Sequence, residues 1–278
     1  MCAVQTNISA AETTERYQVR AVTRALDVLL AFRELSSPVE LGVLARHTGL
    51  HPTSTLRYVE SLRSRGLVRS VGSGGYELGS PVFELATGYL RGLSVWSHAS
   101  DLAERLAAEA NETASVGVLD NGEVLYVAIA NGQRELGIQS TPGTRHPAHC
   151  TALGKAMLAD LAWDDVRAIL RDHPPVRLTN RTLLEPEDLR SDLERVRARG
   201  YAVDDEERTL GVVCIGAAIR DHTGRTVAAA SVSGPTFRVH EAEREELARL
   251  VIRVADGVSR RLGADPGYAT VGPGGEIR

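Results

Sequence analysis

The spacing of apolar residues predicts two short helices in succession between Leu41 and Leu62. The first helix ends at Gly49, because glycine readily adopts the left-handed conformation that closes a helix. The second begins at Pro52, because backbone N–H groups in the first turn of a helix have no partner within the helix, so proline, which lacks one, fits there. The second helix has an apolar face with Thr55, Val59 and Leu62 and a polar face with Thr53, Ser54 and Arg57. Two helices joined by a glycine-containing turn predict a helix-turn-helix whose second helix enters the DNA major groove.

A strand, a turn and a second strand follow these helices. Residues 67–71 and 76–78 have strand character, and residues 72–75 between them include three glycines. This pattern predicts the hairpin wing of a winged helix-turn-helix. An amphipathic helix precedes the pair, with apolar positions Val22, Ala25, Leu26, Leu29, Leu30 and Phe32. An ordinary helix pair with a surface hairpin is the alternative, but order, spacing and charge together favour a DNA-binding domain over residues 18–79.

The rest of the chain predicts a connecting helix and a second domain. Residues 80–99 have an apolar face that needs a partner, either the second domain or a second subunit. Residues 100–262 alternate between helical and strand patterns, with a strong hairpin turn at Asn121-Gly122. We therefore expect an α+β domain with a mixed or antiparallel sheet. Residues 1–17 are predicted to be a disordered tail, and residues 263–278 a flexible one.

Charge is distributed unevenly along the 278 residues. Residues 16–69 contain nine arginines and four acidic residues, whereas residues 100–278 contain 22 basic and 28 acidic residues. A basic segment on an otherwise acidic chain predicts that phosphate contact is confined to one end. The net charge of −4 argues against a protein that coats nucleic acid along its whole surface.

Cysteine and lysine usage add two constraints. Three cysteines without framework spacing predict no disulfides and a reducing compartment. No signal peptide or membrane-spanning run is visible, so a cytoplasmic location is expected. Lys155 is the only lysine among 32 basic residues, which suggests that its position is constrained.

Two groups of residues suggest metal or thiol chemistry, and both have simpler interpretations. His146, His149 and Cys150 are metal-capable, but a zinc site usually draws its ligands as two separated pairs, and no second pair is obvious. Turn and capping roles are therefore favoured, and no metal or other cofactor is predicted. Cys214 lies within a predicted buried strand, where a thiol is normally inert and lines a pocket at most.

The remaining polar motifs do not form a catalytic site. Ser231 and Ser233 alternate along one strand and face the same side, but neither lies in a Gly-x-Ser-x-Gly motif. The acidic run 204–207 is expected to be solvated, except for Asp204 next to the strand. Gly154-Lys155 lacks the upstream glycine of a phosphate-binding loop. We therefore predict that the chain is not an enzyme.

The chain resembles the IclR (isocitrate lyase regulator) family of bacterial transcription factors over residues 18–262. Each matching segment is weak alone, but their order and spacing are specific. The segments are Arg24-Ala25-Leu26, Leu44-Ala45 through Gly49-Leu50, Ser54 to Leu62, Tyr76 to Gly79, His146-Pro147, Ala152 to Ala156, Arg197 to Glu206, Gly211 to Gly216 and Ser231 to Gly234. The resemblance implies a winged helix-turn-helix, a linker helix and a GAF-like effector-binding domain, working as a homodimer or a dimer of dimers.

The resemblance also implies an effector-binding site. The family's pocket-lining positions correspond here to Leu136, Ala152, Leu153, Asp204, Cys214, Ser231 and Ser233. Hydroxyls, a thiol and a carboxylate suit a small organic acid or an aromatic metabolite equally well. The function implied is a ligand-responsive regulator, predicted to repress a neighbouring catabolic operon. The alternative is a thiol- or metal-dependent sensor or a small-molecule enzyme that uses the second domain.

The recognition helix departs from the family pattern. Pro52 and Leu56 replace positions that are often polar in relatives, so base contacts are predicted for Thr53, Ser54 and Arg57 instead. Phosphate contacts are predicted for Arg24, Arg46, Arg63, Arg65 and Arg69. A dimer that binds two half-sites about one helical turn apart predicts a palindromic double-stranded operator.

Overall fold

The computed structural model describes residues 19–72, 74–134 and 141–265. Contacts between residues divide the chain into two compact units, Met1–Gly92 and Leu93–Arg278. The predicted strand over residues 136–140 lies outside the described residues.

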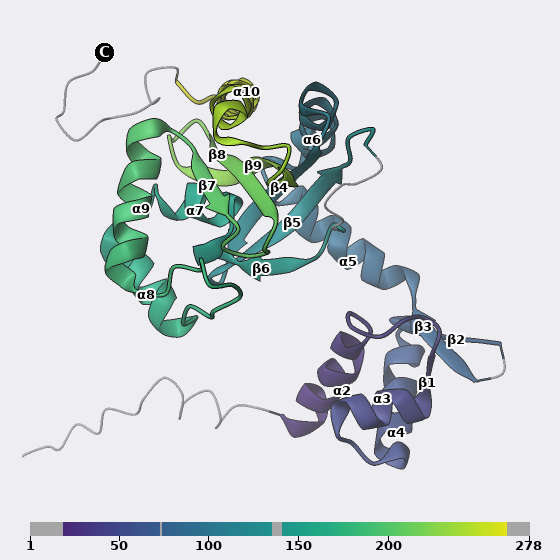
Figure 1. The fold of residues 1–278 in the computed structure, drawn as a ribbon. Coiled ribbons are helices and arrows are strands. Elements are labelled where there is room, and N and C mark those ends of the chain that lie inside the picture. The colour runs from purple at the N-terminus through teal and green to yellow at the C-terminus, as the bar shows by residue number, and fades with distance from the viewer. Residues whose placement is uncertain (1–18, 73, 135–140, 266–278) are drawn as a thin grey trace, which may run out of the picture. The chain divides into compact units, whose positions relative to one another are not determined.

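The first unit is a winged helix-turn-helix (Figure 1). Its elements are α2 (Arg20–Ala31), β1 (Val39–Glu40), α3 (Leu41–Thr48), α4 (Pro52–Ser64), β2 (Val68–Val71), β3 (Gly75–Leu78) and α5 (Ser80–Arg91). Both predicted helix boundaries are confirmed. Gly49 closes α3 in the left-handed conformation, at φ 66°, and Pro52 is the first residue of α4. The wing strands β2 and β3 pair antiparallel, and the two-residue strand β1, which was not predicted, adds a third strand.

The apolar face predicted for the first helix is only partly correct. Val28 and Ala31 of α2, and Phe32 directly after it, are buried in the core of the first unit. Val22, Leu26 and Leu30 are instead 55%, 49% and 53% exposed. The helix carries apolar residues on two sides, and periodicity alone does not tell which side the core covers.

The helix predicted over residues 80–99 is two helices. α5 ends at Arg91, and α6 (Trp96–Ala110) begins after a turn that contains Gly92. Glycine weakens a helix interior by about 1 kcal/mol relative to alanine, so a break here is cheap. Val95 is buried in the core of the second unit, which places the chain beyond the break within that unit.

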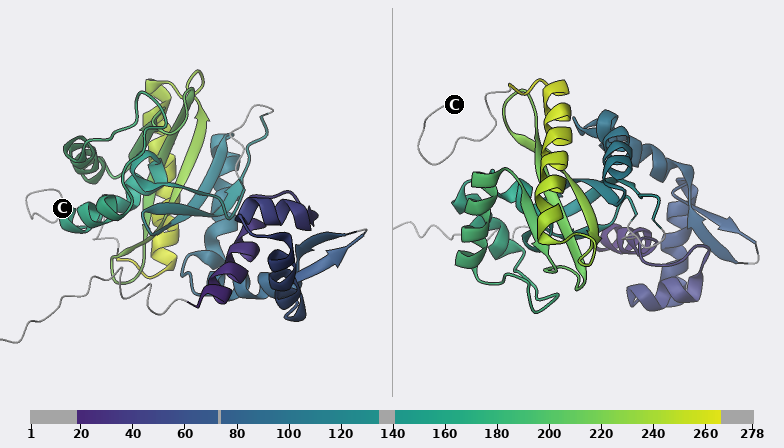
Figure 2. Two further views of the ribbon diagram at one scale, coloured as in Figure 1. Left: turned by 90° about the horizontal axis from the view of Figure 1, so that it is seen from below. Right: turned by 45° about the horizontal axis from the view of Figure 1, so that its top comes forward.

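The second unit is a six-stranded antiparallel sheet between two layers of helices (Figures 1 and 2). The strand order is β6-β5-β4-β9-β8-β7. The strands are β4 (Thr113–Asp120), β5 (Glu123–Ala130), β6 (Arg145–Pro147), β7 (Ala202–Asp205), β8 (Val212–Arg220) and β9 (Thr226–Pro235). One face packs on α6 and α10 (Glu241–Arg261). The other face packs on α7 (Ala152–Leu158), and α8 (Trp163–Asp172) and α9 (Pro186–Arg199) share that core.

The described part of the second unit contains two cores on opposite faces of the sheet and a smaller cluster of Val213, Ile215, Val239 and Ala248. Small residues such as Ala114, Ala217 and Ala230 bring α6 and α10 close to the sheet. On the opposite face, Leu153 and Leu158 of α7 meet Leu189 and Leu193 of α9. Within the described residues, no helix has the length and apolar character to cross a membrane.

Candidate DNA-binding helix and effector site

The polar face of α4 is available for contact. Thr53 and Arg57 are exposed and Ser54 is partly exposed, whereas Thr55 and Val59 are buried against the core. His51 caps the start of α4, where its Nδ1 accepts a hydrogen bond from the Thr53 N–H at 3.4 Å. The side chain of Arg57 forms no ion pair with any described residue. The helix therefore presents hydroxyls and a free guanidinium on a rigid support, as the major groove requires.

The predicted phosphate-contacting arginines are all exposed but differ in their partners. Arg63 Nη2 lies 3.0 Å from Glu60 Oε2, and Arg69 Nη2 lies 2.7 Å from Glu77 Oε2 across the wing. Arg24 Nη1 lies 3.9 Å from Asp27 Oδ2. Arg46 and Arg65 form no ion pair among the described residues. These two have no local carboxylate to release before they contact a phosphate.

Strand register brings four of the predicted effector residues together. Asp204, Cys214 and Ser233 are direct cross-strand partners on β7, β8 and β9. Residues directly opposite each other in antiparallel strands share one face of the sheet. Ser231 lies two positions from Ser233, so its hydroxyl is on the same face. Asp204, Ser231 and Ser233 are buried, and Cys214 remains partly exposed. The predicted inward orientation of Asp204 is confirmed.

The start of α7 covers this face of the sheet. A Cβ added at Gly216 of β8 would lie 2.8 Å from the Ala152 carbonyl oxygen, and one at Gly154 would lie 2.2 Å from that of Ala148. Backbones approach so closely here that only glycine fits. Ala152 and Leu153 therefore sit directly over the strands that carry the polar residues. Leu136, the seventh predicted effector residue, lies outside the described residues.

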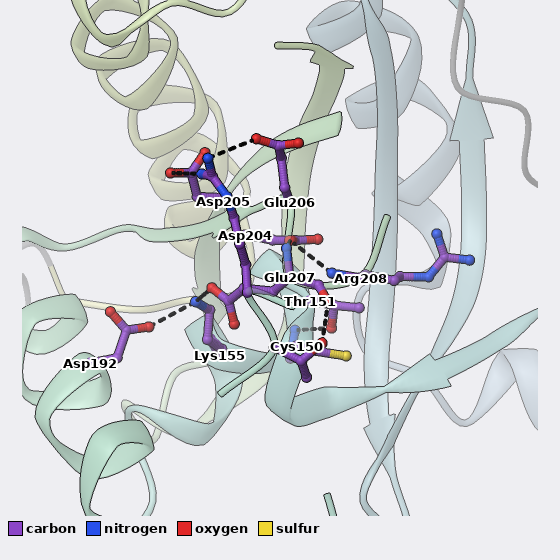
Figure 3. Close-up of polar contacts among 12 residues, drawn as sticks. Cys150, Thr151, Lys155, Asp192, Asp204, Asp205, Glu206, Glu207 and Arg208 are labelled. Carbon is purple, nitrogen blue, oxygen red and sulfur yellow. Dashed lines mark hydrogen bonds and ion pairs between the residues drawn. The ribbon is translucent and has the colours of Figure 1, made fainter. Parts of the chain in front are cut away.

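Lys155 is buried in a cluster of acidic side chains (Figure 3). Its exposed fraction is 1%, and its Nζ donates hydrogen bonds to Asp192 Oδ2, at 2.7 Å, and to Glu207 Oε1. Burial alone would lower the pKa of Lys155, but Glu207 and Asp192 outweigh it and raise the pKa. A charged lysine therefore ties α7 to α9 and to the loop after β7.

The acidic run 204–207 is not simply solvated, and that prediction was wrong for Glu207, which is 6% exposed. Burial raises the pKa of Glu207 to about 7, with further raising by Asp204 and Asp192, although Lys155 opposes the shift. Burial likewise raises the pKa of Asp204 to about 6. Lys155, together with Arg195 at Asp192, supplies two cations for three buried carboxyl groups, so at least one carboxyl group holds a proton more tightly.

The loop that carries Glu207 is held in place by hydroxyl groups. Thr182 donates a hydrogen bond to the Glu207 carbonyl oxygen at 2.7 Å, and Thr179 donates one to that of Glu206 at 2.7 Å. Asp204 Oδ1 accepts hydrogen bonds from the N–H groups of Glu207 and Arg208, at 2.8 and 3.3 Å. The loop is therefore a rigid wall of the site.

His146, His149 and Cys150 turn toward different partners. His146 lies against Arg208, His149 Nε2 lies 3.3 Å from the Val176 carbonyl oxygen, and Cys150 Sγ lies 3.8 Å from that of Pro147. No described group of three or more histidine, cysteine or acidic residues is arranged to hold a metal ion. Burial raises the pKa of Cys150 to about 12 and also raises that of Cys214. Both thiols therefore stay protonated at neutral pH, which disfavours thiolate chemistry.

Sequence reasoning missed Asp192, Tyr126 and Arg208. Asp192 lies on the apolar stripe of α9 between Leu189 and Val196, and a carboxylate on that stripe was a detectable sign of a buried partner. Tyr126 and Arg208 gave no comparable signal, because an aromatic residue in a strand and an arginine in a loop are ordinary.

A winged helix-turn-helix with a free polar recognition face, followed by a separate unit with convergent buried polar groups, defines a two-domain transcriptional regulator. Residues 21–72 match the IclR helix-turn-helix domain, and residues 87–260 match the C-terminal domain of the bacterial transcriptional regulator IclR. The chain belongs to the IclR family.

Relatives match the chain over most of its length. The HTH-type transcriptional regulator BhcR of Paracoccus denitrificans is 35% identical over 242 residues, 87% of this chain and 86% of BhcR. The transcriptional repressor IclR of Escherichia coli is 32% identical over 249 residues, 88% of this chain and 91% of that repressor. An IclR homologue from Microbacterium hydrocarbonoxydans, solved with 4-hydroxybenzoate, shares the fold with a TM-score of 0.74. It is 22% identical, and the match covers 87% of this chain and 98% of the homologue.

Proposed function

We propose that this protein is a ligand-responsive repressor that binds a palindromic operator through α4 and a small organic acid or aromatic metabolite through the second unit. The observation that carries the proposal is the pairing of a free polar face on α4 with a convergent buried site elsewhere in the chain. The 4-hydroxybenzoate bound to a structural relative supports an effector of this size and chemistry. The repressor role rests on the 32% identity with the IclR repressor.

Base contacts are assigned to Thr53, Ser54 and Arg57, and phosphate contacts to Arg24, Arg46, Arg63, Arg65 and Arg69. The effector residues are Leu136, Ala152, Leu153, Asp204, Cys214, Ser231 and Ser233. The required coupling between the sites is modest, about 1–3 kcal/mol, because a change of that size alters DNA affinity 5- to 150-fold. Exposed apolar residues on α2 and α5, such as Leu26 and Phe83, support association into a homodimer or a dimer of dimers.

The proposal is tested with the DNA that lies upstream of the protein's own gene. Fluorescence anisotropy at low salt compares this DNA with a shuffled duplex of the same length and composition. Specific binding should exceed non-specific binding by about 10³-fold or more. Equal affinity for the two duplexes would contradict the assignment of a specific operator, because phosphate contacts alone do not discriminate sequence.

A further inference from the structure

Arg208 is a cation without an anionic partner beside the predicted effector residues. It follows Glu207 in the chain, but its side chain points away from the Lys155 cluster (Figure 3). Its Nη2 lies 2.8 Å from Nε2 and 3.1 Å from Nδ1 of His146, and its Nη1 donates to Thr209 Oγ1 at 3.2 Å. Among the described residues it forms no ion pair. A guanidinium has five N–H donors, so these two contacts leave three of them free.

The histidine partner orients Arg208 without neutralising it. Burial, followed by the positive charge of Arg208, lowers the pKa of His146 to about 4. At neutral pH the imidazole is therefore uncharged and accepts a hydrogen bond from Arg208. His146 itself is fixed, because β6 pairs with β5 and the ring packs edge-on against Tyr126, with centroids 5.1 Å apart. The positive charge of Arg208 is therefore held in position before any ligand binds.

The surroundings of Arg208 are those of the predicted effector site. Its charge lies close enough to Tyr126, Cys150 and Cys214 to lower the pKa of each, against the larger effect of burial. Tyr126, His146, Cys214 and Arg208 are all partly exposed, unlike the sealed Lys155 cluster. The nearby carboxylate of Asp204 is directed to the backbone N–H groups of Glu207 and Arg208 and not to the guanidinium.

The charges of the site favour a monoanion over a phosphate. Lys155 is another cation close in sequence to Ala152 and Leu153, but Asp192 and Glu207 already bind its ammonium group. Among the described residues of the site, a phosphate dianion would thus meet the single unpaired cation Arg208 and the adjacent carboxyl of Asp204. A carboxylate needs a single cation, and its two coplanar oxygens match two parallel N–H groups of a guanidinium.

We propose that Arg208, oriented by His146, binds the carboxylate of a small monocarboxylic effector and so sets the specificity of this site. The inference rests on the proposed function and names its ligand class. The apolar or ring-bearing part of the effector then lies toward Tyr126 and Cys214. Arg208 was not among the effector residues predicted from the sequence.

The test measures binding of matched acids and amides to the full-length protein by isothermal titration calorimetry. The probes are 4-hydroxybenzoate with 4-hydroxybenzamide, benzoate with benzamide, and pyruvate with pyruvamide. At least one acid should bind the wild-type protein more tightly than its amide. Arg208→Gln should lower the affinity for that acid by about 10- to 100-fold, the loss expected for a charge-assisted hydrogen-bonded pair. The affinity for the amide should stay unchanged.

Two further variants control for charge and folding. The affinity of Arg208→Lys for the acid should lie between those of wild type and Arg208→Gln, because an ammonium keeps the charge but loses the bidentate geometry of a guanidinium. Arg171→Gln removes an exposed charge from α8 and should bind every probe as wild type does. Near-ultraviolet circular dichroism checks that each variant is folded. If Arg208→Gln is unfolded, the acid and amide affinities of Arg208→Lys test the role of Arg208 instead.

Three results would overturn the inference. These are unchanged acid binding in folded Arg208→Gln, equal loss of acid and amide, and the absence of any acid that wild type prefers over its amide at millimolar concentration. The same variants are assayed on the upstream DNA without probe, where Arg208→Gln should match wild type. Failure of wild type to bind that DNA specifically would count against the proposed function, whereas the acid and amide comparison stands independently of it.

Discussion

The two units of the protein use charged side chains in opposite ways. In the DNA-binding unit the described arginines lie at the surface, and the arginine ion pairs Arg24–Asp27, Arg63–Glu60 and Arg69–Glu77 are exposed or partly exposed. In the second unit Lys155, Asp192 and Glu207 are buried together. An exposed cation remains available to a polyanion that arrives from solvent. A small ligand needs groups fixed before it binds, and a buried ionic cluster provides the rigid support.

The largest effect should come from removing the cation of the buried cluster. Lys155→Met leaves the buried Glu207 carboxyl without its cation and leaves Asp192 with Arg195 alone, at 3.0 Å. This should lower the free energy of unfolding by about 3–5 kcal/mol. Urea denaturation of the full-length protein measures this loss. The matched surface variant Arg69→Gln breaks the pair with Glu77 and should cost less than about 1 kcal/mol. Similar losses in the two variants would remove the distinction between the units.

Protonation of Glu207 gives the next largest effect. Its pKa is about 7 in the folded protein and near 4.5 when unfolded, so the folded state binds the proton more tightly. The stability that this group contributes is therefore complete below pH 4.5 and is lost as the pH rises toward and through 7. Glu207→Gln should abolish this dependence and gain up to about 3 kcal/mol relative to wild type between pH 4.5 and pH 8.

Urea midpoints of wild type and Glu207→Gln at pH 5, 6, 7 and 8 measure the difference. Glu194→Gln on the exposed side of α9 is the control and should leave a constant offset. Parallel pH profiles for wild type and Glu207→Gln would show that Glu207 does not take up a proton in this range.

Arg57 tests the recognition face of the DNA-binding unit. Arg57→Ala should weaken binding to the upstream DNA by about 1–3 kcal/mol and relax discrimination at one base pair in each half-site. Anisotropy titrations with single-base variants of the site measure both effects. Arg167→Ala removes an exposed arginine from α8 and should leave the affinity unchanged. A uniform loss across all base variants would reassign Arg57 to a phosphate contact.

The smallest effect concerns a single phosphate contact. Arg46→Gln should flatten the slope of log affinity against log salt by roughly 0.9, because one fewer counterion is released. Titrations on the upstream DNA at several salt concentrations give the slope. Arg171→Gln supplies the control of equal charge loss in the second unit. An unchanged slope in Arg46→Gln would place Arg46 outside the DNA contact.

The sequence predicted the helix-turn-helix well because its signals are local. Gly49 and Pro52 mark the helix boundaries, and the buried positions of α4 follow from spacing alone. The exposed positions Val22, Leu26 and Leu30 could not be predicted, because their exposure depends on which side of α2 the core covers.

Part of the proposed effector site could be assembled from the sequence for the same reason. Ser231 and Ser233 share a face through strand alternation, and Asp204 adjoins a strand, so local pattern found them. The Lys155 cluster depends on contacts across 37 and 52 residues of chain, to Asp192 and Glu207. The rarity of lysine in the chain predicted that the position of Lys155 is constrained, but the sequence did not indicate which carboxylates bind it. The role of Arg208 could not be predicted from the sequence, because His146 lies beside it only through the position of β6 in the fold.

The proposed role of α4 is to read a palindromic DNA sequence. Selection of binding sites from a random duplex library with the purified full-length protein measures this without knowledge of the effector or the target gene. We expect enrichment of an inverted repeat with half-sites about one helical turn apart, and loss of one specified base pair in each half-site for Arg57→Ala. Recovery of no enriched motif, or of the same motif with Arg57→Ala as with wild type, would contradict it.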